Sequence, residues 1–193
     1  MKTVFLDVDT QLDFLYPAGA LYVPGAEVIE PALADLTRFA AQNEITIISA
    51  ADAHAEDDPE FKIWKPHCVA GTQGQAKSSA TLLAKSLVLR SVEDSPTVGQ
   101  IIVEKQQIDP FTNPLLPVLL DRLAADRFVV YGLVLEYCVK ASLFGLLRRH
   151  ASRVEFVAEV SRALNPDEGR AMLDRFTAEG GKLITLGDAC RLP

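Results

Sequence analysis

The strongest constraint on the fold is an alternation, along most of the chain, of short apolar runs with longer stretches in which apolar residues recur at helical spacing. The short runs predict buried strands at 4–8, 45–51, 86–90, 100–105, 128–133, 154–160 and 182–186. The periodic stretches predict helices at 28–41, 115–125, 136–149 and 167–179. Strands that alternate with helices form βαβ units. The sequence therefore predicts an α/β fold, a three-layer sandwich with a mostly parallel sheet and helices on both faces.

The length of the chain favours a single domain. A domain spanning all 193 residues buries roughly 70% of the unfolded chain's surface on folding, so it needs no disulfide or structural metal as a staple. Apolar residues make up 49% of the chain and charged residues 23%. These fractions fit a globular protein and not a disordered one.

Charge and hydropathy argue against two classes of partner. The formal net charge is -7, and an acidic surface repels phosphate backbones, so we expect no nucleic-acid partner. No apolar run approaches the ~18 residues of a membrane span, and Asp7 and Asp9 come too early for a signal peptide. The three cysteines, Cys68, Cys138 and Cys190, do not suggest a disulfide framework. We therefore expect a cytoplasmic protein with reduced thiols and no membrane partner.

Polar side chains follow three predicted strands where packing alone would not place them. Asp9 follows the first strand, Lys105 ends the fourth, and Cys138 comes just after the fifth. Ligands of parallel sheets lie beyond the carboxyl ends of the strands, so these residues are candidates for one site. An acid that moves the proton and a lysine that stabilises negative charge are able to activate a thiol. Asp7 shares a strand face with Asp9, so either fits the base, and an Asp–Lys salt bridge at the sheet edge is the structural alternative.

Cys138 lies where the helix at 136–149 is expected to begin. The positive end of a helix dipole favours thiolate, and the free backbone N–H groups there face an incoming oxyanion. A buried structural cysteine is the commoner fate of a free thiol, and spacing alone slightly favours it. The functional interpretation of Cys138 depends on whether Asp9 and Lys105 converge on it.

The polar stretch at 52–85 has no clear period, and a loop of that length is usually functional or disordered. It contains Asp52, His54, Glu60 and His67 within sixteen positions. Nitrogen and oxygen ligands of this kind suit zinc, iron or manganese better than calcium. A solvated acidic loop explains the composition equally well.

Two aromatic residues lie nearest these motifs. Phe14 comes five residues after Asp9, and Trp64 comes three residues before His67. Each fits either the core or a flat wall beside a ring-shaped substrate.

Several segments of the chain match a set of motifs that occur together, in this order, in one enzyme family. The first two are Asp-Thr-Gln-Leu-Asp-Phe at 9–14, which resembles D-x-Q-x-D-F, and Pro-Ala-Gly-Ala-Leu-Tyr-Val-Pro-Gly-Ala at 17–26. Asp-Ala-His at 52–54 resembles a D-x-H metal motif. The others are Trp-Lys-Pro-His-Cys-Val-Ala-Gly-Thr at 64–72, Glu-Lys at 104–105 and Gly-Leu-Val-Leu-Glu-Tyr-Cys-Val-Lys-Ala at 132–141. Together they resemble the motifs of the isochorismatase-like cysteine hydrolases, in the form seen in nicotinamidases. The resemblance covers residues 1–147 and implies the same α/β fold.

The resemblance also implies roles for individual residues. It makes Asp9 rather than Asp7 the base, Lys105 the stabilising cation and Cys138 the nucleophile. It implies an oxyanion hole at the backbone N–H groups of Val134 and Cys138, beside a cis peptide bond between Leu133 and Val134. The substrate-binding residues that it implies are Phe14, Trp64 and Leu133, and the metal ligands are Asp52, His54, Glu60 and His67.

The function implied is a metal-assisted amidohydrolase that converts nicotinamide to nicotinic acid and ammonia through a thioester at Cys138. One divalent ion, zinc, iron or manganese, is the expected cofactor, and a small aromatic amide and a homo-oligomer are the expected partners. Glu60 stands where relatives often have histidine, and the segment 106–111 departs from the family pattern beside the pocket. The alternatives are another small-amide hydrolase of the same superfamily, a non-catalytic α/β binding protein, and a redox-sensing thiol protein with Cys68 as the resolving cysteine.

Overall fold

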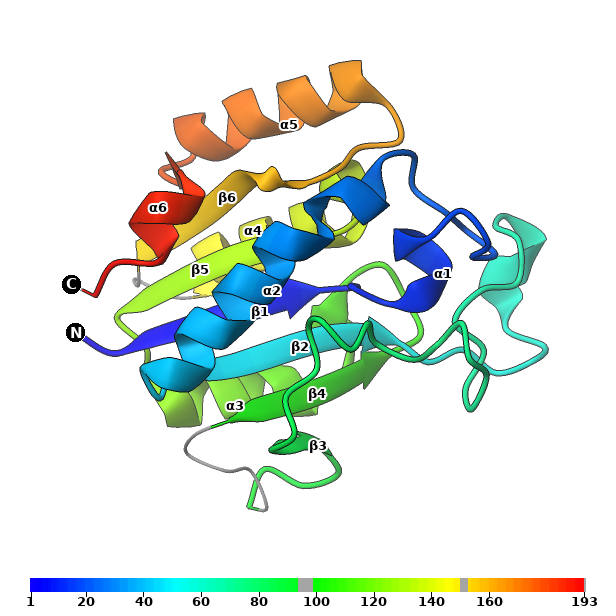
Figure 1. Cartoon of the computed structure of the whole chain (residues 1–193), viewed down its shortest axis with the longest axis horizontal. Helices are drawn as coiled ribbons and strands as arrows, with labels where there is room; N and C mark the ends of the chain where they lie inside the picture. Colours follow the sequence, from blue (N-terminus) through cyan, green and yellow to red (C-terminus); the bar gives the residue numbers. More distant parts are fainter. Residues whose placement is uncertain (94–98, 150–152, 193) are drawn as a thin grey trace.

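The computed structural model describes residues 1–93, 99–149 and 153–192, and its centre is a seven-stranded parallel sheet (Figure 1). The strand order is β3-β4-β2-β1-β5-β6-β7, and every neighbouring pair is parallel. The predicted parallel sheet is therefore confirmed. The strands are β1 (Thr3–Val8), β2 (Thr46–Asp52), β3 (Ser86–Val88), β4 (Gln100–Lys105), β5 (Arg127–Gly132), β6 (Arg153–Ser161) and β7 (Lys182–Ile184).

Helices cover both faces of the sheet, as the sequence predicts. Alternate residues of β1 show how the two cores form: Val4, Leu6 and Val8 belong to a cluster with α3, α4 and α5, whereas Phe5 packs with α2 and α6. Both cores follow from the period of two in a strand that is covered on each side. The helices are α1 (Leu12–Leu15), α2 (Ala26–Gln42), α3 (Leu115–Leu123), α4 (Lys140–Arg149), α5 (Pro166–Ala178) and α6 (Leu186–Ala189).

The last predicted strand and the predicted helix at 136–149 differ from the expectation for a clear local reason. The last strand stops at Ile184 because Thr185 begins α6, where its side chain accepts the N–H of Asp188 and the Asp188 carboxylate accepts the N–H of Thr185. This reciprocal capping box stabilises a helix start. The helix predicted at 136–149 begins as a π-helical turn, Leu135–Val139, and continues as α4. Single π turns of this kind are frequent at functional sites.

The carboxyl ends of β1, β2, β4 and β5 meet at one edge of the sheet. Asp52 pairs in register with Lys105, and Val8 pairs with Gly132. Gly132 has a φ of +119°, and a Cβ there would lie 2.1 Å from the carbonyl oxygen of Val8. Only glycine allows the two strand ends to approach so closely. The chain after β5 therefore leaves directly beside the residue that follows β1, which is Asp9.

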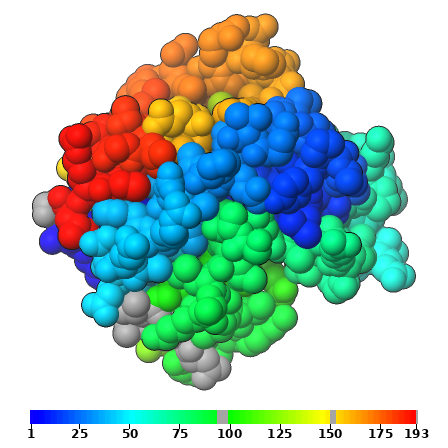
Figure 2. Space-filling model, in the orientation of Figure 1, coloured from blue at the N-terminus to red at the C-terminus, as the bar shows by residue number. Residues whose placement is uncertain are grey.

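The long connection between β2 and β3 lies against the segment that follows β1 (Figure 2). Three backbone hydrogen bonds join the two segments: Leu12 N–H to Ala76 O, Asp13 N–H to Gly74 O, and Ser78 N–H to Thr10 O. The connection includes a 3₁₀ turn at Pro59–Lys62.

No helix in the described part of the chain combines the length and apolar character that a membrane span requires.

Candidate active site

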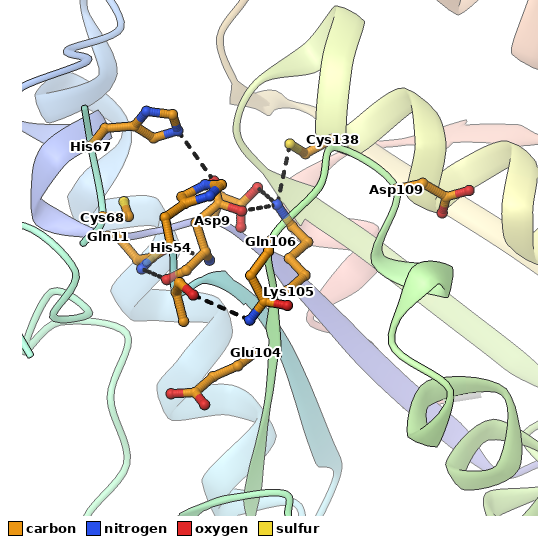
Figure 3. A network of polar contacts seen from close by, with 12 residues as sticks. Asp9, Gln11, His54, His67, Cys68, Glu104, Lys105, Gln106, Asp109 and Cys138 are labelled. Carbon is orange, nitrogen blue, oxygen red and sulfur yellow. Dashed lines mark hydrogen bonds and ion pairs between the residues drawn. The ribbon is translucent and has the colours of Figure 1, made fainter. Parts of the chain in front are cut away.

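Lys105 is the centre of a buried polar cluster at this edge of the sheet (Figure 3). Its Nζ lies 3.0 Å from Asp9 Oδ2 and 3.4 Å from Cys138 Sγ, and it also donates a hydrogen bond to Asp52 Oδ1. All four side chains are buried. The structure thus brings together the three residues that the sequence proposes as reacting groups, although their chemical roles remain predictions.

The backbone fixes Asp9 and Cys138 in unusual conformations. Asp9 has a φ of 50°, a region that non-glycine residues rarely adopt, and its N–H donates to Ala50 O at 2.9 Å. Cys138 lies in the π turn rather than at the expected start of an α-helix. The predicted cis peptide bond between Leu133 and Val134 is present. The N–H groups of Val134 and Cys138 remain the predicted oxyanion hole.

Burial and charge tune the acid–base groups of this cluster. Burial raises the pKa of Asp9 to about 7, and the neighbouring Lys105 offsets only part of that effect. Burial also holds the pKa of the Cys138 thiol well above its ordinary value, against the attraction of Lys105. Burial alone would lower the pKa of Lys105, but Asp52 and Asp9 outweigh it and keep the group charged. The resting site therefore contains a neutral thiol beside an aspartate whose pKa suits proton transfer near neutral pH.

Asp7, the other candidate base, has a different partner. Its carboxylate pairs with Lys77 Nζ at 2.7 Å and accepts hydrogen bonds from Thr10 Oγ1 at 2.9 Å and Ser49 Oγ at 3.1 Å. Asp9 instead shares Lys105 with Cys138. The geometry therefore favours Asp9 as the base.

Asp52, His54 and His67 form a group whose ligating atoms all lie within 4.8 Å of one another. The Nε2 atoms of both histidines lie 3.7 Å from Asp52 Oδ2, too far for a hydrogen bond. The opposite ring nitrogens are held in place, His54 Nδ1 by Asp58 Oδ2 at 3.0 Å and His67 Nδ1 by the carbonyl oxygen of Lys65 at 2.7 Å. Metal-ligating histidines characteristically have such a partner on the second nitrogen.

The group fits a divalent metal ion on structural grounds. The buried Nε2 of His54 has no hydrogen-bond partner among the described residues, and a buried polar atom needs one. Lys105 holds the pKa of Asp52 well below its ordinary range despite burial, so this carboxylate stays ionised. Two imidazole nitrogens and one carboxylate oxygen suit zinc, iron or manganese.

Glu60, the fourth ligand predicted from the sequence, does not join this group. It lies half-buried in the 3₁₀ turn Pro59–Lys62, where it lines the adjoining pocket, and burial raises its pKa. The carboxylate that the sequence interpretation missed is Asp58, the partner of His54 Nδ1. Its only sequence signal is a carboxylate four residues after the histidine.

Two further positioning residues were overlooked within the first motif. The Gln11 side chain accepts the N–H of Asp52 at 2.7 Å and donates to its carbonyl oxygen at 2.8 Å. Asp13 accepts the N–H of Cys68 at 2.7 Å, one residue after His67. The D-x-Q-x-D-F spacing contained this signal, because it places Gln11 against the end of β2 and Asp13 against the loop that carries His67.

A pocket opens onto Cys138, Asp52 and His67. Phe14 and Trp64, the aromatic residues predicted to bind substrate, both line it, with the Phe14 ring 5.4 Å from the His67 ring. Leu133 does not line it, because that side chain is fully buried in the core with α2. The apolar wall consists mainly of Phe14, Leu21, Trp64, Ile108, Tyr137 and Leu164.

The geometry gives little support to a redox role for Cys68. Cys68 is a free, buried cysteine, and burial raises the pKa of its thiol far above the ordinary value. Redox-active cysteines are instead low in pKa and accessible to solvent.

A family model described as the isochorismatase domain matches residues 3–188. The chain belongs to the isochorismatase family. One relative, an uncharacterised isochorismatase-family protein PncA of Bacillus subtilis, is 29% identical over 145 residues, which covers 72% of this chain and 75% of that protein. The chain is thus a hydrolase of the isochorismatase family.

Solved structures share the fold of this family member. The pyrazinamidase of Pyrococcus horikoshii in complex with zinc superposes with a TM-score of 0.81 at 23% identity, over 96% of this chain and 99% of that chain. The nicotinamidase/pyrazinamidase PncA of Bacillus subtilis gives a TM-score of 0.80 at 20% identity, over 95% and 99% of the two chains. The N-carbamoylsarcosine amidase of Thermoplasma acidophilum gives 0.77 at 23% identity, over 96% and 97%. At these identities the similarity shows the fold and not the substrate.

Proposed function

We propose that this protein is a metal-assisted cysteine amidohydrolase that converts nicotinamide to nicotinic acid and ammonia. The observation that carries the proposal is the position of Lys105, which contacts Asp9, Cys138 and Asp52 at once. One buried cation thereby joins a base, a nucleophile and a ligand of the metal group. A cysteine nucleophile in reach of a base is what covalent hydrolysis of an amide requires.

The first half of the reaction forms a thioester. Asp9 takes the proton of the Cys138 thiol, and the thiolate attacks the carboxamide carbon. The backbone N–H groups of Val134 and Cys138 hold the resulting oxyanion, while the Lys105 ammonium offsets the negative charge of the cluster. Protonated Asp9 then gives its proton to the amide nitrogen, the carbon–nitrogen bond breaks, and ammonia leaves.

The second half releases the acid. Asp9 takes a proton from a water molecule, which attacks the thioester carbon, and the carbon–sulfur bond breaks. The departing thiolate of Cys138 takes that proton back from Asp9 to become a thiol, and nicotinic acid departs. A metal ion held by Asp52, His54 and His67 would supply a Lewis acid that binds the ring nitrogen. Phe14 and Trp64 would orient the ring from the pocket walls.

The charge of the pocket favours a neutral aromatic amide over substrates that carry a carboxylate. The lining residues, all of which lie in the described part of the chain, include no lysine or arginine but do include Asp52 and Glu60. A carboxylated amide would meet no cationic side chain on the pocket wall, whereas a flat neutral ring fits the aromatic and aliphatic side chains. Another small neutral amide is the second candidate, because the aromatic and aliphatic walls do not require a ring nitrogen in the substrate.

The decisive experiment measures ammonia release from nicotinamide, with the metal content assayed on the same sample. Benzamide is the matched control substrate, since it differs only by lacking the ring nitrogen. Cys138→Ala should abolish turnover, whereas Cys190→Ser should leave it unchanged. Metal-dependent release that prefers nicotinamide supports the proposal. No release from either amide by metal-loaded protein would reject nicotinamide and direct the search to other amides.

A further inference from the structure

A second buried Asp–Lys pair lies beside the catalytic one. Lys77 Nζ contacts Asp7 Oδ2 at 2.7 Å, and the two side chains are 3% and 0% exposed. Neither residue contacts the pocket, and the proposed reaction uses neither. A buried ion pair requires good geometry and additional hydrogen bonds to offset the loss of hydration, so its partners indicate what it does.

Besides Ser49 Oγ, which donates to Asp7 at 3.1 Å, the pair has a partner in Thr10, the residue after Asp9. Lys77 Nζ lies 2.7 Å from Thr10 Oγ1, and Thr10 Oγ1 in turn donates to Asp7 Oδ1 at 2.9 Å. The main chain of Thr10 is held as well, because its carbonyl oxygen accepts the N–H of Ser78 at 3.1 Å. Thr10 is thus fixed through both its side chain and its main chain.

The fixed residue lies between two groups of the site. On one side is Asp9, whose carboxylate meets Lys105 at 3.0 Å, and on the other is Gln11, whose side chain binds the backbone of Asp52. Asp9 has a φ of 50°, and a strained conformation of this kind persists only where the surrounding structure holds it. The contacts of Thr10 with Asp7 and Lys77 supply that restraint from the side of the sheet edge.

We propose that Asp7 and Lys77 are positioning residues that act through Thr10 to hold the Asp9 carboxylate beside Lys105 and Cys138. This inference rests on the role of Asp9 in the proposed function. A displacement of about 1 Å in a reacting group is able to cost ~10²-fold in rate. The pair therefore affects turnover without touching the substrate.

The test is the double variant Asp7→Leu/Lys77→Met. Removing both charges avoids an unpaired buried ion, and apolar replacement of a buried pair is often tolerated. The neighbouring hydroxyl groups keep other partners, since Thr10 Oγ1 lies 2.9 Å from Thr81 Oγ1 and Ser49 Oγ accepts from Gln100 Nε2 at 2.8 Å. The single variant Lys77→Arg, which keeps Asp7, the positive charge and the N–H donors, is the conservative comparison.

The matched control is the double variant Arg127→Met/Glu155→Leu. It removes another buried pair, with Arg127 Nε 2.8 Å from Glu155 Oε2, at the opposite end of the sheet strands. Any loss of activity that follows from reduced stability alone should appear in both double variants. A loss of activity caused by a misplaced Asp9 should appear only in the Asp7→Leu/Lys77→Met variant.

The expected result for Asp7→Leu/Lys77→Met is a kcat about 10–100-fold below wild type with KM within about twofold, since a misplaced base slows chemistry and leaves binding unchanged. The control double variant should keep a kcat within about twofold of wild type. Lys77→Arg should keep most of the wild-type kcat. A wild-type kcat in the first variant, or an equal loss in the control, would overturn the inference.

A crystal structure of the double variant separates this inference from the proposed function. If the wild-type protein releases no ammonia from nicotinamide, the kinetic comparison fails but the structural one remains. We expect the Asp9 carboxylate to move by about 1 Å or more from Lys105 Nζ, the displacement that matters for rate. An Asp9 that keeps its 3.0 Å contact with Lys105 would refute the positioning role, whatever the substrate is.

Discussion

Lys105 and Asp52 link the two halves of the site through a single carboxylate. The Nζ atom of Lys105 donates to Oδ1 of Asp52, while Oδ2 of the same residue lies 3.7 Å from the Nε2 atoms of His54 and His67. Asp52 and Lys105 are also paired in register at the ends of β2 and β4. The adjacent strand ends of the parallel sheet therefore bring Lys105, the neighbour of Cys138, into contact with the Asp52–His54–His67 group.

The position of Asp52 predicts how metal binding depends on the acidic residues of the loop. Asp52→Asn should weaken metal affinity by more than the ~10–100-fold that loss of an outer partner costs, and Asp58→Asn should fall within that range through His54. Glu60→Gln should change affinity least, because its carboxylate lies outside the ligand group. Competition with a chelator measures all three. A Glu60→Gln effect as large as that of Asp52→Asn would instead make Glu60 a ligand.

The pKa of Asp9 predicts the acid limb of the pH profile. Burial raises that pKa from 3.8 to about 7 against the opposing effect of Lys105. A base works only when it is unprotonated, so kcat/KM should rise with pH and level off above about 7, whereas an ordinary aspartate would place this limb near 4. Ammonia release between pH 4.5 and 9, at constant metal content, measures the profile. A limb near pH 4 would show that Asp9 is not the titrating base.

The periodic elements of the fold were predictable from the sequence because their signal is local. Residues of β1 alternate between two cores, and α2 carries its buried residues at helical spacing, so pattern alone defines them. The short elements were missed for the same reason. Helices of four residues such as α1 and α6 depend on caps and tertiary contacts rather than on a period.

The site was predictable as a set of residues but not as an arrangement. The strand-end rule placed Asp9, Lys105 and Cys138 at one edge of the sheet, but only the structure shows that Asp7 pairs with Lys77. The same period of two puts both aspartates on one strand face, and the turn at Asp9 that separates them depends on a positive φ that no pattern reveals. The resemblance implies that Leu133 binds substrate, but its side chain packs into the core.

Tight packing of α4 behind the pocket predicts that Gly145→Ala lowers stability and raises KM. A Cβ at Gly145 in α4 would lie 2.1 Å from the Phe111 ring, so the segment that carries Ile108 must shift. Overpacking of this kind costs about 1–3 kcal/mol, and we expect that loss in the free energy of unfolding together with a higher KM. Denaturant titration and steady-state kinetics measure the two effects. The control is Gly187→Ala in α6, where the atom nearest to the added Cβ would be 3.7 Å away. Equal losses in both variants would show that the contact between Gly145 and Phe111 is not the cause.

The two hydrogen bonds between Gln11 and the backbone of Asp52 predict that Gln11 matters more to the metal group than its neutral side chain suggests. Gln11→Leu removes both bonds and leaves a buried N–H group and a buried carbonyl oxygen with lost partners, at about 1–3 kcal/mol each. Because Asp52 would then lose its alignment with His54 and His67, metal affinity should fall about 10–100-fold.

The matched control for this change is Gln106→Leu, since Gln106 makes one longer side-chain bond, 3.2 Å, to the neighbouring carbonyl oxygen of Ala53. Unfolding by denaturant gives the free-energy loss, and chelator competition gives the affinity. Gln11→Leu should lower both the free energy of unfolding and the metal affinity. Gln106→Leu should change the free energy of either process by no more than ~1 kcal/mol, the net contribution of one hydrogen bond. If the two variants bind metal equally well, the alignment of Asp52 comes from the β2–β4 pairing alone and not from the first motif.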